Sequence, residues 1–98
     1  MLAVEEILKR YCTSETVRIL MVHGRMVAGK ALEACSAVNA DSETRRLVIE
    51  AAYLHDIGVC KVAAPDINCF GTEPYIRHGV LGRELLDAEG LPLHALIC

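Results

Sequence analysis

The sequence predicts an all-α domain, built as a compact array of about five helices. Apolar residues recur at three- and four-residue spacing along most of the chain, and no segment shows a convincing two-residue alternation typical of a half-buried strand. Hydrophobic residues make up 53% of the 98 residues but aromatic residues only 4%, which favours packing of Ala, Leu, Ile and Val between helices. The length suits one small domain and no Pro-, Gly- or Ser-rich linker divides it, so residues 1–98 are predicted as a single domain.

The first part of the chain predicts two helices. Residues 2–12 carry apolar side chains at helical spacing and form the first. Thr13 provides a cap for a second helix over residues 15–38, whose apolar stripe faces the core. Gly24 and Gly29 lie inside this helix, where each glycine costs about 1 kcal/mol relative to Ala. Glycines at these positions would permit another helix to approach closely.

A turn and cap before residue 43 begin the third predicted helix, over residues 43–55, and Gly58 is interpreted as its stop signal. The connection over residues 59–71 is long for a compact domain, and such loops are usually functional. Residues 72–90 predict a fourth helix, with Thr72 as its cap and Pro74 in its first turn.

The last eight residues, 91–98, predict the start of a further helix. Pro92 fits a first helical position, but the apolar run reaches Cys98 without a terminating signal. We therefore expect the natural domain to continue past Cys98. Helices left partly uncovered would expose apolar patches that are rare in monomers, so a homo-oligomer with residues 91–98 in or near the contact is predicted.

Composition excludes several classes of protein. Net charge is −3 and the basic residues are scattered, so the basic stripe of a protein that binds a nucleic-acid duplex is missing. No stretch approaches the roughly 18 apolar residues that a membrane span needs. The N-terminal residues lack the basic and apolar pattern of a signal peptide. Cytoplasmic residence, without a membrane partner, is the expectation.

The five cysteines form no C-x-x-C pair and are odd in number. They are interpreted as reduced thiols that mostly pack as small hydrophobic residues. A nucleophilic role for Cys60 or Cys69 is the alternative, although no dedicated activating base lies nearby in the sequence.

The strongest chemical signal is the adjacent pair His55 and Asp56 at the end of an apolar helix. An unpaired carboxylate beside Leu54 and Ile57 would be costly to bury, and a divalent cation would compensate its charge. Imidazole nitrogen and carboxylate oxygen suit Mn, Fe, Zn or Mg. Neighbouring side chains on a helix diverge by about 100°. The pair therefore meets at one ion only if the last turn loosens near Gly58; otherwise it addresses two ions.

The segment Tyr53–Gly58, of sequence YLHDIG, resembles the signature of the HD superfamily in its HDIG form. The resemblance implies an HD-domain-like helical fold, whose C-terminal helices this chain would lack, and a metal-dependent phosphohydrolase. His23, 32 residues before His55, matches the family's first ligand on an earlier helix. His78 with Gly82 matches the H-x-x-x-G pattern of members that hold a second ion. The implied ligands of one or two divalent ions are His23, His55, Asp56 and His78.

Further roles follow from the same resemblance. Asp56 is implied as a catalytic ligand that bridges to the second ion. Lys61, where related proteins often have a basic residue, is either a catalytic phosphate partner or a solvated loop lysine, and Arg77 is a weaker candidate for phosphate. The family's later Asp ligand has no match in this chain, and His94 lies too near His78 to serve as the additional histidine.

The sequence leaves two functions open. The first is hydrolysis of a nucleotide or small phosphoester, in which a divalent ion lowers the pKa of a bound water and polarises a phosphoryl oxygen. The alternative is a non-catalytic module of HD fold that binds metal or nucleotide, or that mediates oligomerisation.

Overall fold

A computed structural model describes residues 2–98 and confirms the all-α fold class. Residues 2–98 contain five α-helices: α1 (Val4–Tyr11), α2 (Ser14–Ala37), α3 (Ser42–Leu54), α4 (His78–Ala88) and α5 (Pro92–Ala95). Between α3 and α4 lie the 3-10 helices η1 (Ile57–Lys61), η2 (Pro65–Ile67) and η3 (Tyr75–Arg77), with the strands β1 (Ala63–Ala64) and β2 (Cys69–Phe70). None of the helices described is long and apolar enough to cross a membrane.

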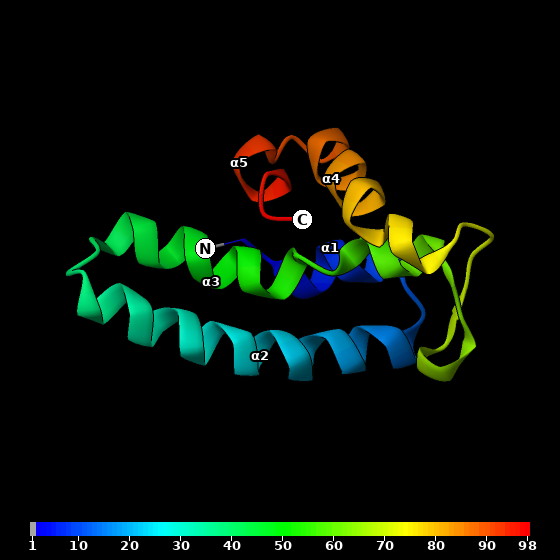
Figure 1. Ribbon diagram of the computed structural model, residues 1–98, viewed down its shortest axis with the longest axis horizontal. Coiled ribbons are helices and arrows are strands. Elements are labelled where there is room, and N and C mark those ends of the chain that lie inside the picture. Colours follow the sequence, from blue (N-terminus) through cyan, green and yellow to red (C-terminus); the bar gives the residue numbers. More distant parts are fainter. Residues whose placement is uncertain (1) are drawn as a thin grey trace.

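The helices α2 and α3 run antiparallel, side by side, along the longest axis of the molecule (Figure 1). The shorter α1 packs against both of them, and α4 and α5 lie on the side of α3 away from α2 (Figure 1). The segment η1 continues from the end of α3 and packs against α4. This arrangement brings the middle of α2, the end of α3 and the start of α4 to one region.

Local capping explains where α2 and α3 begin. The Thr13 side chain accepts a hydrogen bond from the backbone N–H of Thr16, and the Asp41 carboxylate accepts one from Thr44 N–H at 2.7 Å. These contacts satisfy backbone donors that the first turn of a helix leaves free. The predicted ranges of both helices therefore agree with the structure to within one residue at each end.

The core contains apolar side chains from almost every element. The largest fully buried ones include Leu8 of α1, Leu54 of α3, Ile57 of η1 and Leu86 of α4. Leu54 and Ile57 flank the histidine–aspartate pair, so the chain on both sides of that pair is anchored in the core. The pair itself is only half-buried.

The prediction that Gly58 terminates the third helix is wrong. The helix α3 ends at Leu54, and Gly58 lies inside η1 without a positive φ. Position 58 requires a glycine for packing instead, because a Cβ there would collide with the backbone carbonyl of His78. The absence of a side chain allows η1 and α4 to touch.

The predicted loop and the predicted start of the fourth helix are also wrong in detail. The segment 59–71 contains η2 and an antiparallel hairpin that pairs Ala63 with Phe70, although the sequence has no strand-like alternation there. The helix α4 begins at His78 rather than at residue 72, since Pro74 has an extended backbone and η3 intervenes. Strands of two residues are too short to leave a periodic signal.

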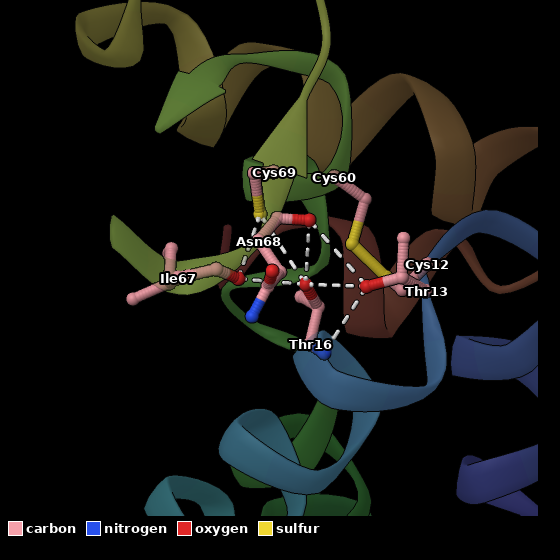
Figure 2. The surroundings of a disulfide bond; sticks show 7 residues. All are labelled: Cys12, Thr13, Thr16, Cys60, Ile67, Asn68 and Cys69. Carbon is pink, nitrogen blue, oxygen red and sulfur yellow. Dashed lines mark hydrogen bonds between the residues drawn. A yellow bond between two sulfur atoms is a disulfide. The ribbon is translucent and has the colours of Figure 1, made fainter. Parts of the chain in front are cut away.

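The prediction of five reduced cysteines is wrong for two of them. Cys12 and Cys60 form a disulfide, with Cα atoms 5.2 Å apart (Figure 2). Cys35, Cys69 and Cys98 are free. The partners lie 48 residues apart in the chain. A search for closely spaced cysteines, such as a C-x-x-C pair, therefore cannot detect this disulfide.

Candidate metal centre

Four elements contribute the residues of the metal cluster, which we define as His23, His55, Asp56 and His78. His23 lies in the middle of α2, His55 is the C-cap of α3, Asp56 precedes η1 and His78 is the first residue of α4. Close packing positions two of these elements. A Cβ at Gly24, next to His23, would lie 2.8 Å from the Cα of Tyr53, so the glycine brings α2 against α3 beside the cluster.

The Asp56 carboxylate is at the centre of the cluster. Its Oδ2 lies 3.2 Å from Nε2 of His23 and 3.3 Å from Nε2 of His55, and its Oδ1 lies 3.6 Å from Nε2 of His78. The structure therefore brings together all four residues for which the sequence predicted a ligand role. Each retains some exposure, with side-chain values from 25% for His55 to 48% for His23, so the cluster is open to solvent.

A change of backbone conformation lets the adjacent residues His55 and Asp56 share one centre. His55 keeps helical angles, whereas Asp56 departs from the helix with φ −101° and ψ 11°. Side chains that would diverge on a regular helix therefore converge. Of the two alternatives left open by the sequence, the structure has the loosened turn, which begins at Asp56 and precedes Gly58.

Backbone carbonyls fix the orientation of two imidazole rings. Nδ1 of His55 lies 2.7 Å from the Ala52 carbonyl oxygen, and Nδ1 of His78 lies 2.9 Å from the Tyr75 carbonyl oxygen. Because a carbonyl oxygen can only accept, each Nδ1 carries the proton and donates it. In the neutral rings the Nε2 lone pairs then point toward the anionic Asp56. A positive charge, from protons or from a metal ion, must stabilise this arrangement.

In the metal-free chain, protons supply part of that charge. The hydrogen bond to Asp56 raises the pKa of His55 above its usual value, although burial opposes the rise. The hydrogen bond from His55 lowers the pKa of Asp56 against the effect of burial, and the neighbouring histidines lower it further. A divalent ion therefore competes with a proton for the Nε2 of His55.

The spacing of two pairs of donor atoms, both of which include the Asp56 carboxylate, fits a divalent ion. Two ligand atoms that each lie about 2.1 Å from one ion are separated by roughly 3.0–3.4 Å for octahedral to tetrahedral angles. The distances of 3.2 and 3.3 Å from Asp56 to His23 and His55 fall in this range. These three residues offer one donor atom each within 4.8 Å of one another. His78, at 3.6 Å from the other carboxylate oxygen, lies where it could support the same ion or a second.

The structure does not bring Lys61 or Arg77 into the metal cluster. Lys61 is exposed at the end of η1 and lines a cavity of about 510 Å³ with Glu73 and Glu84. Arg77 pairs with Glu73, with Nη1 3.2 Å from Oε2. Their phosphate roles stay predictions.

His94 is a buried structural residue. Its Nε2 lies 3.0 Å from Oε1 of Glu50, whose other oxygen accepts a hydrogen bond from the Leu2 backbone N–H. Burial acts to raise the pKa of Glu50, but the hydrogen bonds from Leu2 and His94 and the charge of His94 together lower it below its usual value. The pair links α5, α3 and the N-terminal segment. Glu50 lies in α3 among apolar residues, and no motif in the sequence indicates its pairing with His94.

One residue near the cluster was also missed. Cys98 is half-buried, and burial together with the charge of Asp56 raises the pKa of its thiol to about 11. It is therefore a protonated thiol at neutral pH. No motif in the sequence relates Cys98 to Asp56.

The chain matches one known protein family along almost its whole length. A family model described as HD domain matches residues 1–97, which include all four residues of the cluster. The corresponding comparisons with curated proteins and with solved structures found no match.

Proposed function

The chain belongs to the HD-domain family, and we propose that it is a metal-dependent phosphohydrolase that acts on a nucleotide or small phosphoester. The observation that carries the proposal is the single carboxylate of Asp56, which faces three imidazole Nε2 atoms at 3.2–3.6 Å. Two of those rings are held by backbone carbonyls with their lone pairs directed at it. This donor set suits Mn, Fe or Zn and, less specifically, Mg.

In this proposal each residue of the cluster has a defined role. His23, His55 and Asp56 hold the first ion, and His78 supports a second ion or completes the first. A bound divalent ion lowers the pKa of a water molecule and polarises a phosphoryl oxygen. The Ala52 and Tyr75 carbonyls keep the His55 and His78 rings oriented, which preserves ligand geometry during turnover.

The substrate contact is assigned to Lys61. This residue lies on η1, the element that begins directly after Asp56, and its side chain is exposed. A basic group there would neutralise charge that develops on a phosphoryl group in the transition state.

A non-catalytic metal-binding module is the second candidate. A cavity of about 600 Å³, large enough for a small ligand, lies between α1 and α2 and includes none of the four cluster residues. A small-ligand cavity that includes no metal ligand would favour a structural or regulatory ion over a catalytic one.

Phosphate release separates the two candidates. The purified chain, loaded with Mn²⁺ or Zn²⁺, would be assayed against p-nitrophenyl phosphate, its bis-ester and a panel of nucleotides. Metal-dependent hydrolysis that Asp56→Asn removes and the exposed control Asp66→Asn retains is the result expected of the enzyme. Binding of metal without hydrolysis of any of these esters would favour the module.

A further inference from the structure

We propose that the Cys12–Cys60 disulfide is a redox site that a dithiol reductant opens, and that its state sets the metal affinity of the neighbouring cluster. The proposal rests on the metal-binding part of the proposed function. It concerns regulation of that site by a covalent bond to which the sequence gives no role (Figure 2).

The position of the bond supports a link to the metal cluster. Cys12 caps the end of α1 and directly precedes Thr13, the N-cap of α2. Cys60 lies in η1, four residues after Asp56. A 3-10 helix rises about 2 Å per residue, which places Cys60 about 8 Å along the chain from Asp56. The bond therefore ties the start of the helix that carries His23 to the element that follows Asp56.

This tie acts on two of the elements that meet at the metal cluster. His23 and Asp56 approach to 3.2 Å across the gap between α2 and η1. The other side of η1 packs on α4, where Gly58 touches the His78 backbone. With the bond closed, η1 is cross-linked to the junction of α1 and α2. With the bond open, η1 keeps only its non-covalent packing, chiefly on α4 and also on α1 and β2.

The disulfide is accessible to a reductant. Neither cysteine is fully buried, and both line a cavity of about 240 Å³ together with Thr16, Phe70 and Gly71. Cys35 and Cys69, in contrast, are buried. An external thiolate can therefore reach the disulfide through this cavity.

The surrounding contacts preserve the fold when the bond opens. The Thr16 hydroxyl donates to the Ile67 carbonyl at 2.7 Å, and the Thr13 hydroxyl lies 3.4 Å from the Asn68 carbonyl (Figure 2). These hydrogen bonds attach the hairpin segment to α2 without the disulfide. Reduction therefore removes the covalent cross-link between η1 and the α1–α2 junction, while the hairpin segment stays attached to α2.

The chemistry is thiol–disulfide exchange with a small or protein dithiol. A thiolate of the reductant attacks Sγ of Cys60, a new S–S bond forms, and Sγ of Cys12 leaves as a thiolate. The N-terminus of α2 stabilises that leaving thiolate. The second thiol of the reductant then displaces Cys60. Two electrons and two protons pass to the protein, which gains two thiols, and the reductant becomes a disulfide.

The test compares metal affinity in the two redox states. The chain is equilibrated in mixtures of reduced and oxidised dithiothreitol, desalted without oxygen, and titrated with Mn²⁺ in a calorimeter. Alkylation and mass measurement count the thiols. We expect the dissociation constant for Mn²⁺ to rise at least tenfold on reduction and to recover on reoxidation. Cys12→Ser should match the reduced state, whereas the control Cys35→Ala should remain redox-sensitive.

A second readout is independent of metal. In the metal-free chain, amide hydrogen exchange over residues 57–61 should accelerate on reduction, while exchange in the middle of α3 should not. Equal Mn²⁺ affinity in both states, or global unfolding on reduction, would overturn the inference, because the bond would then be inert or purely structural. A redox-dependent affinity without any hydrolysis would refute the phosphohydrolase and leave this inference standing.

Discussion

At the scale of single residues, the metal cluster depends most on Asp56. Its carboxylate is the one anionic group among three imidazoles, so its removal leaves neutral ligands that cannot balance a divalent charge. We predict that Asp56→Ala lowers metal affinity by on the order of a hundredfold or more and abolishes phosphatase activity. Titration calorimetry and phosphate release measure the two effects. Full metal stoichiometry and rate in the variant would show that Asp56 is not a ligand.

The pKa shifts of the cluster predict opposite pH dependences with and without metal. In the metal-free chain, the raised pKa of His55 contributes stability that is complete below about pH 6.5 and is lost as pH rises through the folded pKa. The lowered pKa of Asp56 contributes stability above its unfolded pKa that is lost as pH falls through the folded value. The contribution of the pair is therefore largest between these two transitions.

Bound metal should reverse the loss of stability at alkaline pH, because the ion binds only the deprotonated form of His55. Between pH 6 and 8.5 the melting temperature of the metal-loaded chain should rise relative to that of the metal-free chain. Thermal unfolding followed by circular dichroism checks this, with Asp56→Asn as the variant in which the difference disappears. A difference that stays constant across this pH range would contradict proton–metal competition at His55.

Sequence reasoning located the four residues of the cluster but not the neighbours that orient them. A histidine–aspartate pair and two further histidines at familiar spacing are visible in the chain. The carbonyls of Ala52 and Tyr75 and the thiol of Cys98 carry no signal in residue identity, because their role depends on backbone geometry and tertiary contact. For the same reason Lys61 was assigned to phosphate from its position in the chain alone.

At the scale of secondary-structure elements, the contact between η1 and α4 places His78. A Cβ at Gly58 would collide with the His78 carbonyl, so Gly58→Ala must push the two elements apart. We predict a loss of about 3 kcal/mol in the free energy of unfolding, the upper range for overpacking, and weaker metal binding. Urea denaturation and calorimetry measure both.

Gly29 offers the matched control. It lies in α2, exposed, with nothing within 4 Å of a Cβ built there. Gly29→Ala should therefore raise the free energy of unfolding by about 1 kcal/mol and leave metal affinity unchanged. Equal effects at the two positions would refute the packing role of Gly58.

The sequence predicted some elements well and others poorly, for a physical reason. The starts of α2 and α3 depend on Thr13 and Asp41, whose side chains accept hydrogen bonds from backbone N–H groups only three residues ahead. The local sequence is therefore sufficient to predict where these helices begin. Between residues 55 and 78, structure depends on distant contacts, such as Gly58 against His78 and Gly71 against Lys61. No local periodicity encodes these contacts.

At the scale of the whole molecule, the disulfide closes a large part of the chain. The loop between Cys12 and Cys60 spans 48 residues, for which chain entropy in the unfolded state gives about 4 kcal/mol of stabilisation. Reduction should therefore lower the melting temperature by about 15 °C or more while the chain remains folded at 25 °C. Calorimetry of oxidised and reduced samples tests this, and coincident melting curves would refute it.

Several large apolar side chains remain exposed on the single chain. Leu93 and Leu96 are 61% and 63% exposed in the C-terminal segment, and Ile76 beside α4 is 88% exposed. We propose that self-association covers part of this surface, and we predict a dimer or larger species at micromolar concentration. Light scattering that gives a mass near the 10.7 kDa of one chain would contradict this prediction.

The central claim is that His23, His55 and Asp56 hold a divalent ion. Crystals of the chain grown with Mn²⁺ or Zn²⁺, measured at the absorption edge of the metal, test it most directly. The account predicts an anomalous peak about 2.0–2.2 Å from Nε2 of His23, Nε2 of His55 and a carboxylate oxygen of Asp56. A well-ordered cluster with no anomalous peak, or a peak held by other residues, would contradict it.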